Sequence, residues 1–576
     1  MLNENSRFSE VPQVDIGRST FDETHTHTTT LNAGKLVPIF CQEVLPGDTF
    51  SLNTATVARM STPIYPVMDD CYVDTYYFFV PNRLTWSHWK EFMGENSTGY
   101  WIPQTDYYIP QLNFTYNPET KTGDNEIGSV ADYFGVPVDQ MKSFSGSSGG
   151  YFSVNALPFR AYVLIWNEWF RDQNVMQPAY FYTGDEDRTY SGITVSSIDD
   201  ILQHAIDGGP LLPVSKYHDY FTSCLPGPQK GPDVNLPLSG LLEVISGDVN
   251  PNSIAHSTNN VMTDITPNSS HNGAPVYISS GGNGVKGALS YTGAAASQVD
   301  YTDTNGLHFT NLYANLGDTS NAFCSIAALR NTFQIQKFYE QLARGGSRYR
   351  ELLKSMFDVT SPDASMQVPE YLGGKRVIIN MDQVVQTSST DSVSPQGNVS
   401  AFSHTSDMSD SFTKSFTEHG FVIGVSCVRT RHSYQQGLQK FWSRRDRLDY
   451  YFPVFANISE QPVYNKEIFL TGTSSDNEVF GYQEAWADYR YGTNRVSGLM
   501  HQTKDNLNLS PWHYADFYSS LPTLSQSWMQ ETTANIDRTL AVQSSLAHQF
   551  EVSYGFQLKC TRVMPVYSVP GLTDHH

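Results

Sequence analysis

The chain has 576 residues and a formal net charge of −22, from 58 acidic and 36 basic side chains. An acidic excess of this size excludes a histone-like protein, so any nucleic-acid contact must be made by a local basic patch. Charged residues make up only 16% of the chain and aromatic residues 13%, which excludes a disordered chain and favours a protein of strands and loops with extensive aromatic contact surface.

Two strands are predicted near the N-terminus, over residues 50–60 and 71–81. Both segments have the residue composition and spacing of strands, and the stretch between them is rich in turn-forming residues. The second segment carries aromatic residues on both faces. We therefore expect both sides of this strand to be covered by other parts of the protein.

Three helices are predicted in the middle of the chain. Segment 156–174 has large apolar residues at spacings of three and four, which is typical of an amphipathic helix. These residues are Tyr162, Ile165, Trp166, Trp169 and Phe170. Segment 325–346 ends on two glycines that suit a helix C-cap, and segment 348–357 adds a third helix.

The sequence changes character between residues 228 and 322, where Ser, Asn, Gly and Thr dominate without helical periodicity. A loop of this length inside a compact protein is either functional or disordered. Short apolar pieces within it predict an ordered surface excursion. The motif GNGVKG at 282–287 matches GxGxxG, but its surroundings lack the strand and helix of a dinucleotide-binding loop, so we interpret it as a flexible turn.

Long strands are also predicted toward the C-terminus. Segment 550–564 alternates between apolar and polar residues, which predicts a half-buried strand. Segment 420–432 behaves likewise until its apolar face changes to Arg429 and Arg431. Strands at both ends with a few helices between them favour an antiparallel β protein with large inserts over an alternating βαβ fold.

Motifs for catalysis, cofactors or metals carry little weight in this sequence. HExxH and GxxxxGK[ST] do not occur, so a hydrolase on a β scaffold would have only the acidic surplus in its favour. His25 and His27 share one face of an extended segment near Glu23, but a metal site would need a third ligand. The six cysteines stand far apart without a CxxC motif, which predicts buried free thiols. We expect no catalytic residue, no cofactor and no bound metal.

Two clusters of basic residues stand out against the acidic average, one between residues 429 and 447 and one between 330 and 354. Arginine and aromatic side chains bind single-stranded nucleic acid through phosphate contacts and base stacking. The same residue types are enriched at subunit interfaces, and one protein can use them for both purposes. The candidate contact residues are Arg429, Arg431, Lys440, Trp442, Arg444, Arg445, Arg447, Arg344, Arg348 and Arg350.

Several long segments, spread from residue 7 to the C-terminus, resemble one family in collinear order. They include RFSEVPQVDIGRSTFD, KYHDYFTSCLPGPQKG, FQIQKFYEQLARGGSRYRELL, YQQGLQKFWSRRDRLDYYFPVF and CTRVMPVYSVPGLTDHH. The chain is similar to the major capsid proteins of small single-stranded-DNA phages, the Microviridae, in the gokushovirus branch. That resemblance implies a mainly β fold, a single eight-stranded antiparallel jelly-roll barrel with long interstrand loops, a few helices and a large surface insertion.

The resemblance also implies an organisation of the chain. Residues 1–227 would form the N-terminal arm and the first part of the jelly roll, and residues 323–576 would complete it. Residues 228–322 would be the variable insertion, which in this family clusters as a protrusion on the threefold axes, with a proposed role in host attachment. Sixty copies would form the smallest icosahedral (T=1) shell around a circular single-stranded DNA genome.

The expected partners are other copies of the chain, the DNA genome, an internal scaffolding protein, a small DNA-binding protein, a DNA pilot protein and a host surface receptor. The chain would belong to the virion after assembly in the bacterial cytoplasm. We expect no membrane insertion and no signal peptide, because no run of 18 apolar residues occurs and the N-terminus has no apolar or basic region.

Residues 21–30, FDETHTHTTT, depart from the family in carrying no basic residue where related chains are more basic. DNA neutralisation would then fall to the arginine clusters, some of which we expect to face inward or bridge subunits, or to the small DNA-binding protein. A phage receptor- or carbohydrate-binding β-sandwich protein that forms a small oligomer is the alternative. It would explain the aromatic residues and the polar insertion, but not the basic clusters.

Overall fold

The computed structural model describes residues 17–95, 106–117, 122–123, 126–137, 151–190, 195–234, 326–390, 395–503 and 509–567, with short strands between residues 244 and 314. The chain divides into two compact units, Met1–Lys230 with Glu340–His576, and Gly231–Tyr339. The second unit contains the predicted insertion except residues 228–230. The GNGVKG motif lies outside the described residues.

Two antiparallel sheets form the centre of the first unit. The first sheet has the order β1–β24–β4–β20, and β2 also pairs with β24. Its strands are β1 (Ser19–Asp22), β2 (His25–Leu31), β4 (Thr49–Met60), β20 (Thr405–Ser415) and β24 (Phe550–Arg562). The second sheet has the order β17–β5–β21–β3. Its strands are β3 (Val37–Val44), β5 (Cys71–Pro81), β17 (Glu370–Ile378) and β21 (Gly420–Thr430).

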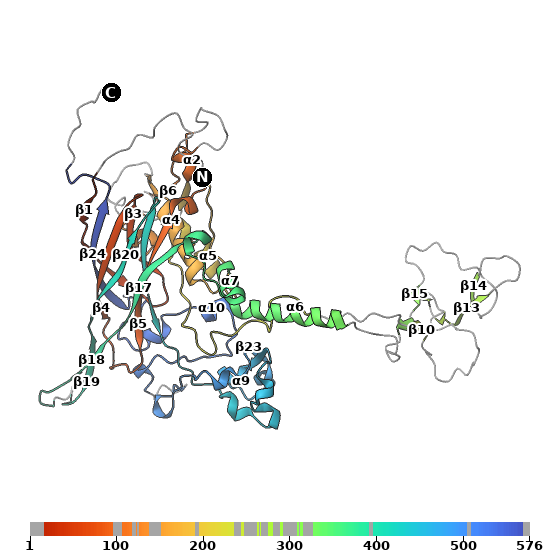
Figure 1. The fold of residues 1–576 in the computed structure, drawn as a ribbon. Helices are drawn as coiled ribbons and strands as arrows, with labels where there is room; N and C mark the ends of the chain where they lie inside the picture. Colours follow the sequence, from red (N-terminus) through yellow and green to blue (C-terminus); the bar gives the residue numbers. More distant parts are fainter. Residues whose placement is uncertain are drawn as a thin grey trace, which may run out of the picture. The chain divides into compact units, whose positions relative to one another are not determined.

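One core of the first unit lies between these two sheets, whose strands run side by side in Figure 1. The alternating residues of β24 turn their apolar side chains into this core and their polar side chains outward, and β4 alternates likewise but also buries Thr54 and Thr56. The first sheet contributes Phe50, Leu52, Phe550, Tyr554 and Phe556, and the second contributes Ile39, Val73, Tyr77, Phe79 and Val422. The strands predicted over 50–60, 71–81 and 550–564 are therefore confirmed.

A second core covers the other face of the β5–β21 sheet. Successive residues of β5 point to opposite faces, so Phe78 and Val80 enter this core while Tyr77 and Phe79 enter the first. The expectation that both sides of 71–81 are covered is confirmed. The strand predicted over 420–432 is confirmed as β21, but its half-burial is wrong, because nearly every residue is buried and Val422 and Val428 pack into the inter-sheet core.

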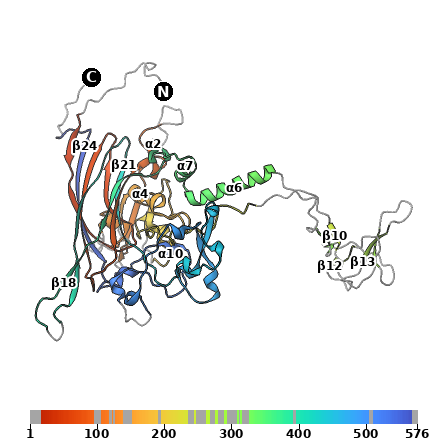
Figure 2. The same ribbon diagram turned by 60° about the horizontal axis from the view of Figure 1, so that its bottom comes forward.

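Helix α4 (Leu157–Ile165) packs against β21 in this second core, and both views place it beside the sheet (Figures 1 and 2). The amphipathic helix predicted over 156–174 is only partly right. The α-helix ends at Ile165 and continues as one π-helical turn, Trp166–Phe170. Seven of its nine α-helical residues are buried, because neighbouring elements cover the helix on nearly all sides.

The remaining helices of the first unit are short. They are α1 (Asn82–Thr85), α2 (Trp89–Phe92), α3 (Val130–Tyr133), α5 (Ile198–His204), α7 (Tyr349–Phe357), α8 (Asp363–Met366), α9 (Asn465–Ile468), α10 (Gln526–Met529) and α11 (Ala534–Asp537). Smaller sheets use β6 (Gln111–Asn117), β7 (Thr122–Gly123), β8 (Tyr151–Asn155), β9 (Arg188–Tyr190), β18 (Met381–Val385), β19 (Val399–Ser403), β22 (Glu460–Tyr464) and β23 (Val479–Glu484). The helix predicted over 348–357 is confirmed as α7.

The second unit carries short antiparallel strand pairs. Its strands are β10 (Val244–Ser246), β11 (Met262–Thr263), β12 (Ile265–Thr266), β13 (Pro275–Ser279), β14 (Ala288–Tyr291), β15 (His308–Phe309) and β16 (Leu312–Ala314). β10 pairs with β16, β12 with β15, and β13 with both β11 and β14. Helix α6 (Ile326–Gly345) confirms the helix predicted over 325–346. The boundary with the first unit falls within this helix, between Tyr339 and Glu340.

The segment after the first 16 residues is a strand of the sheet and not a free arm. β1 and β2 pair along β24, with Phe21 opposite Cys560 and His27 opposite Tyr554. Five cysteines within the described ranges are free thiols, at positions 41, 71, 224, 427 and 560. In the part of the chain that the structure describes, no helix has the length and apolar character needed to cross a membrane. The same residues contain no group of three or more potential metal ligands.

Candidate nucleic-acid and subunit interface

The ten candidate contact residues separate into two main sites in the first unit. Arg348, Arg350 and Arg429 come from different sequence clusters but line one cleft of about 600 Å³. Lys440, Trp442 and Arg444 line a second pocket of about 450 Å³. Arg445 and Arg447 lie close to the second pocket in sequence, whereas Arg344 and Arg431 line neither.

The first site, which we call the arginine cleft, combines cations with aromatic rings. Its six basic residues are Arg171, Lys216, Arg348, Arg350, Arg376 and Arg429, against two acidic residues, Asp172 and Glu351. Its aromatic residues are Tyr76, Phe78, Trp169, Phe170, Tyr217 and Tyr371. β5, β17 and β21 supply one wall, and the π-helical turn with the start of α7 supplies the other.

Arg429, near the end of β21, is held by groups of its own chain. Its Nη2 lies 2.5 Å from Oδ2 of the buried Asp74 and donates to the Tyr76 hydroxyl at 2.8 Å. Arg376 of β17 donates to the same carboxylate, from Nε to Oδ1 at 2.8 Å. Burial alone would raise the pKa of Asp74, but the Arg429 charge and hydrogen bonds from Arg376 and Tyr217 hold it below its ordinary value. One carboxylate thus serves two guanidinium groups.

Arg348 and Arg350 stand at the start of α7 and are anchored across the cleft. Arg348 donates to the carbonyl of Asn167 at 2.7 Å, and its Nε lies 3.4 Å from Oε2 of Glu168. Arg350 donates to the carbonyl of Glu168 at 3.0 Å, and its guanidinium carbon lies 4.0 Å from the centre of the Trp169 ring. These arginines therefore fix the wall of the cleft as well as lining it.

Sequence reasoning did not identify Arg171 and Arg376 as residues of this cleft. Neither belongs to a basic cluster, so local charge density gives no signal for them. Arg171 directly follows the aromatic segment WNEWF, which is the only sequence feature that hints at its environment. In the structure the Arg171 Nε is buried without a hydrogen-bond partner, and the described residues place no carboxylate within ion-pair distance of its guanidinium.

The second site is a surface of exposed aromatic and aliphatic side chains, which we call the aromatic surface. It is formed by Phe441, Trp442, Leu448, Tyr450, Tyr451, Phe452, Val454, Tyr489 and Tyr491. Three short 3₁₀ turns, Lys440–Ser443, Arg447–Asp449 and Pro453–Phe455, leave these residues without a strand or helix to pack on. Trp442 is 66% exposed and Val454 is 87% exposed. Apolar groupings of this kind mark interaction sites on soluble proteins.

The basic residues of the aromatic surface differ in how far they are neutralised. Arg444 is mostly covered, pairs with Asp488 and lies with its guanidinium carbon 4.4 Å from the centre of the Tyr489 ring. Lys440 donates to the carbonyl of Pro462 at 3.1 Å. The side chains of Arg445 and Arg447 are exposed and form no ion pair with any described residue. These two are the cations that this surface can offer to another molecule.

The last two candidates stand apart from both sites. The guanidinium carbon of Arg431 lies 5.7 Å from the centre of the Tyr72 ring, and the residue is exposed. Arg344, near the end of α6, forms an ion pair with Glu460. Its Nη1 also lies 3.9 Å from the Glu484 carboxylate.

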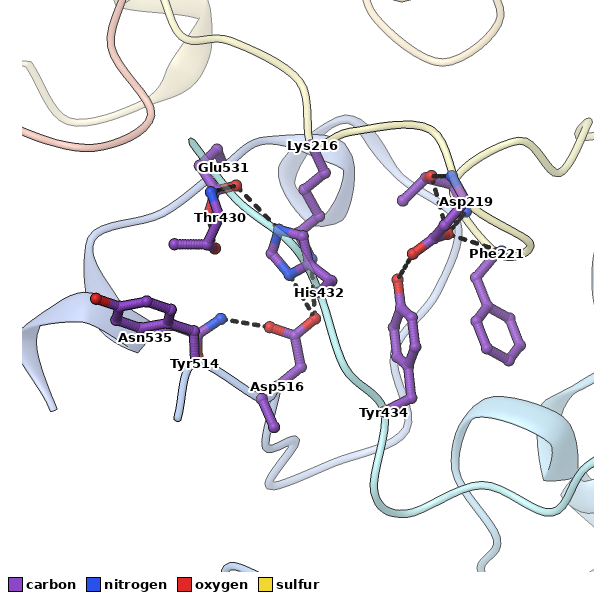
Figure 3. A network of polar contacts seen from close by, with 12 residues as sticks. Lys216, Asp219, Phe221, Thr430, His432, Tyr434, Tyr514, Asp516, Glu531 and Asn535 are labelled. Atoms are coloured by element: carbon purple, nitrogen blue, oxygen red, sulfur yellow. Dashed lines mark hydrogen bonds and ion pairs between the residues drawn. The ribbon is translucent and has the colours of Figure 1, made fainter. Parts of the chain in front are cut away.

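A buried ion network forms around His432 (Figure 3). His432 lies two residues after the end of β21, with Nδ1 2.9 Å from Oδ2 of Asp516 and Nε2 2.9 Å from Oε2 of Glu531. Asn535 donates to Asp516 at 2.5 Å, and Lys216 lies 3.6 Å from the same carboxylate. No local spacing predicts this network, since its members are up to 319 positions apart, from 216 to 535.

The network makes the stability of the fold depend on pH. Burial alone would lower the pKa of His432, but the charges of Glu531 and Asp516 raise it from 6.5 to about 10. Opposing the effect of burial, His432 and Lys216 hold the pKa of Asp516 below its ordinary 3.8. A raised histidine pKa stabilises the fold fully below 6.5, and this contribution is lost as the pH rises to about 10.

We expect the free energy of unfolding to fall between about pH 6.5 and about pH 9, by up to about 1.4 kcal/mol per pH unit from this group. Denaturant unfolding of the full chain at both pH values measures the change. A His432→Gln variant should lose most of that slope, because it has no proton to release in this range. An equal slope in the two proteins would show that His432 is not charged in the fold. The depressed pKa of Asp516 adds a second loss of stability as the pH falls below 3.8.

The chain matches a family model described as "Capsid protein (F protein)" over residues 9–572. Capsid protein VP1 of Chlamydia phage 1 is 38% identical to it, with 98% of each chain covered. Capsid protein VP1 of Bdellovibrio phage phiMH2K is 36% identical, over 98% of this chain and 97% of that protein. Capsid protein VP1 of Spiroplasma virus 4 is 37% identical, over 97% of this chain and 96% of that protein.

Proposed function

The chain belongs to the F-protein family of phage capsid proteins and has a structural role in the virion, and from that premise we propose that sixty copies form a closed T=1 icosahedral shell around a circular single-stranded DNA genome. The observation that carries the self-association is the aromatic surface, whose large apolar side chains stay between 41% and 87% exposed in the single chain. The internal scaffolding protein, the small DNA-binding protein and the pilot protein remain part of this proposal, with assembly in the host cytoplasm.

The two sheets of the first unit support an eight-stranded jelly roll as the shell-forming domain. If β1 and β2 count as one strand along β24, each sheet has four antiparallel strands. The first strand in sequence then pairs with the last, and neighbours in each sheet come from distant parts of the chain. Crossovers of this kind, with an apolar core between two sheets, are typical of jelly rolls in viral capsids.

The aromatic surface fits a contact between subunits better than a contact with DNA. Stacked bases need aromatic faces and phosphates need free cations. This surface also exposes aliphatic residues such as Leu448 and Val454, and Asp446 and Asp449 stand beside its two free arginines. Aromatic residues and arginine at the centre of a patch are the composition of a protein interface. Arg445 and Arg447 would pair with carboxylates of a neighbouring copy.

A double replacement of Arg445 and Arg447 by alanine distinguishes the two uses of this surface. We expect shells that dissociate at lower denaturant concentration but keep their DNA, because cross-subunit ion pairs are lost. Arg59→Ala is the matched control, since Arg59 is an exposed arginine on the outer face of β4. Sedimentation measures shell stability, and the absorbance ratio at 260 and 280 nm measures DNA content. Shells of normal stability that lose DNA at raised salt would assign the surface to the genome.

Host attachment by the insertion is the second part of the proposal. The polar composition of residues 228–322 suits a solvated outer surface, and the second compact unit contains most of this segment. Deletion of residues 235–325 from the phage should leave shells that assemble but adsorb poorly to host cells. Normal adsorption by such shells would remove this role.

A further inference from the structure

We propose that the arginine cleft binds a nucleotide unit of single-stranded nucleic acid, with the base against the exposed ring of Tyr371 and the phosphate at Arg171. The inference deepens the proposed enclosure of a single-stranded DNA genome and rests on it. It assigns the DNA contact to the arginine cleft and not to the aromatic surface. The cleft is lined by residues of both basic clusters and by residues that belong to neither cluster.

The cleft has the size and shape of a small-molecule site. Its volume of about 600 Å³ lies within the range of about 300–1,000 Å³ that is usual for ligand pockets. Two secondary-structure walls hold it open, because Arg348 and Arg350 are tied to the carbonyls of Asn167 and Glu168 on the opposite side. The site therefore exists before any ligand arrives, which limits the ordering cost of binding.

Three rings form an aromatic floor in the cleft. Phe78, Trp169 and Tyr371 have ring centres 5.4, 5.5 and 5.7 Å apart. Arg350 covers part of Trp169, whereas Tyr371 is 41% exposed and offers the accessible ring. A nucleobase stacks on such rings without regard to its identity, because every base has a π-face. This tolerance suits a shell that must contact an arbitrary genome sequence.

Donors for a phosphate lie beside this floor. The Nε atoms of Arg171 and Arg429 are buried and make no hydrogen bond within the described protein. Buried donors without partners are costly, so a ligand that accepts hydrogen bonds from them is stabilised. The Arg376 side chain is 48% exposed. Because Arg376 shares the Asp74 carboxylate with Arg429, part of the Arg376 guanidinium group is left free to donate to a ligand.

The charge balance also favours an anion. Arg171 has no carboxylate within ion-pair distance among the described residues. Burial lowers the pKa of Arg171 and the nearby charge of Arg348 lowers it further, whereas the charges of Glu168 and Asp172 raise it without reaching ion-pair distance. A neutral sugar would form no ion pair with this guanidinium, whereas a phosphodiester matches the guanidinium fork.

Binding of a fluorescein-labelled oligonucleotide of eight deoxythymidines to the full-length chain tests the proposal. Arg171→Gln should weaken binding about tenfold, the usual effect of losing one charge-assisted hydrogen bond. It should also reduce the slope of log affinity against log salt by about 0.7, the contribution of one phosphate contact. Arg59→Gln, which removes an exposed arginine on the outer face of β4, should leave affinity unchanged within twofold.

A second readout needs no variant. The same oligonucleotide with 5-iododeoxyuridine, crosslinked by light to the unmodified chain, should attach to the peptides that contain Trp169 or Tyr371. If Arg171→Gln does not fold, Tyr371→Leu replaces it and should weaken binding while Tyr371→Phe preserves it. Crosslinks at the aromatic surface, or Arg171→Gln that binds as tightly as the unmodified chain, would overturn the cleft assignment and leave the enclosure of DNA standing. Failure of the unmodified chain to bind, together with nuclease-treated particles that contain no DNA, would overturn the enclosure itself.

Discussion

Replacement of His432 by leucine is expected to lower the free energy of unfolding by about 3–5 kcal/mol, the usual result of removing one member of a buried ion network. His432 is buried between the carboxylates of Asp516 and Glu531, 2.9 Å from each. Without the imidazolium, Glu531 has no ionic partner among the described residues, whereas Asp516 retains Lys216 at 3.6 Å. Denaturant unfolding of the unassembled full chain, followed by tryptophan fluorescence, measures the loss.

Two further variants separate the loss of charge from the loss of packing. A triple variant with His432→Leu, Asp516→Asn and Glu531→Gln should recover much of the stability, since it removes the unpaired carboxylates as well. His218→Leu serves as the control, because His218 is exposed and outside the network. A loss below about 0.5 kcal/mol for His432→Leu, the range of ordinary surface substitutions, would contradict the network as a stabilising element.

Replacement of Trp442 by alanine is expected to prevent shell formation at concentrations where the unmodified chain assembles. Exposed tryptophans at the centre of an interface contribute about 2–4 kcal/mol to binding. A loss of 2 kcal/mol raises the subunit concentration needed for each contact about thirtyfold. The effect recurs around the whole shell because every copy carries the same surface. Sedimentation velocity in the presence of the other phage proteins measures the shell fraction.

The fold of the single chain should not change in that variant, because Trp442 is 66% exposed. Trp442→Phe should assemble more readily than Trp442→Ala, since it keeps an aromatic ring beside Phe441. Tyr108→Ala, at another exposed aromatic residue outside the aromatic surface, is the matched control. Normal shells from Trp442→Ala would show that the aromatic surface is not a subunit contact.

Four of the nine strands that the structure describes in the two sheets, β4, β5, β21 and β24, could be predicted from the sequence because a period of two is a local signal. Segments 50–60 and 71–81 correspond to β4 and β5 within one residue at each end. Burial on both faces was evident for 71–81, where aromatic residues occupy both sides. It was missed for 420–432, because Gly424 and Ser426 break the apolar pattern on the second face while Val422 and Val428 still pack into the core.

The interaction residues could be predicted only as a set. The local density of basic residues marks Arg429 and Arg444 as candidates. It does not show that Arg429 pairs with Asp74 and Arg444 with Asp488, which are distant in the sequence. Those pairs form when distant strands and turns meet, so only the fold reveals which arginines remain free. The cleft was missed for the same reason, because its walls come from segments that are hundreds of residues apart.

Cryo-electron microscopy of nuclease-treated particles that contain this chain, with their absorbance ratio at 260 and 280 nm, tests the central claim most directly. We predict closed icosahedral shells of sixty copies, a nucleic-acid-rich ratio and Trp442 buried against a neighbouring copy. Particles no larger than a trimer, even with the other phage proteins present, would contradict the shell and favour a receptor-binding protein. Closed shells with a protein-only absorbance ratio would contradict the enclosure of DNA.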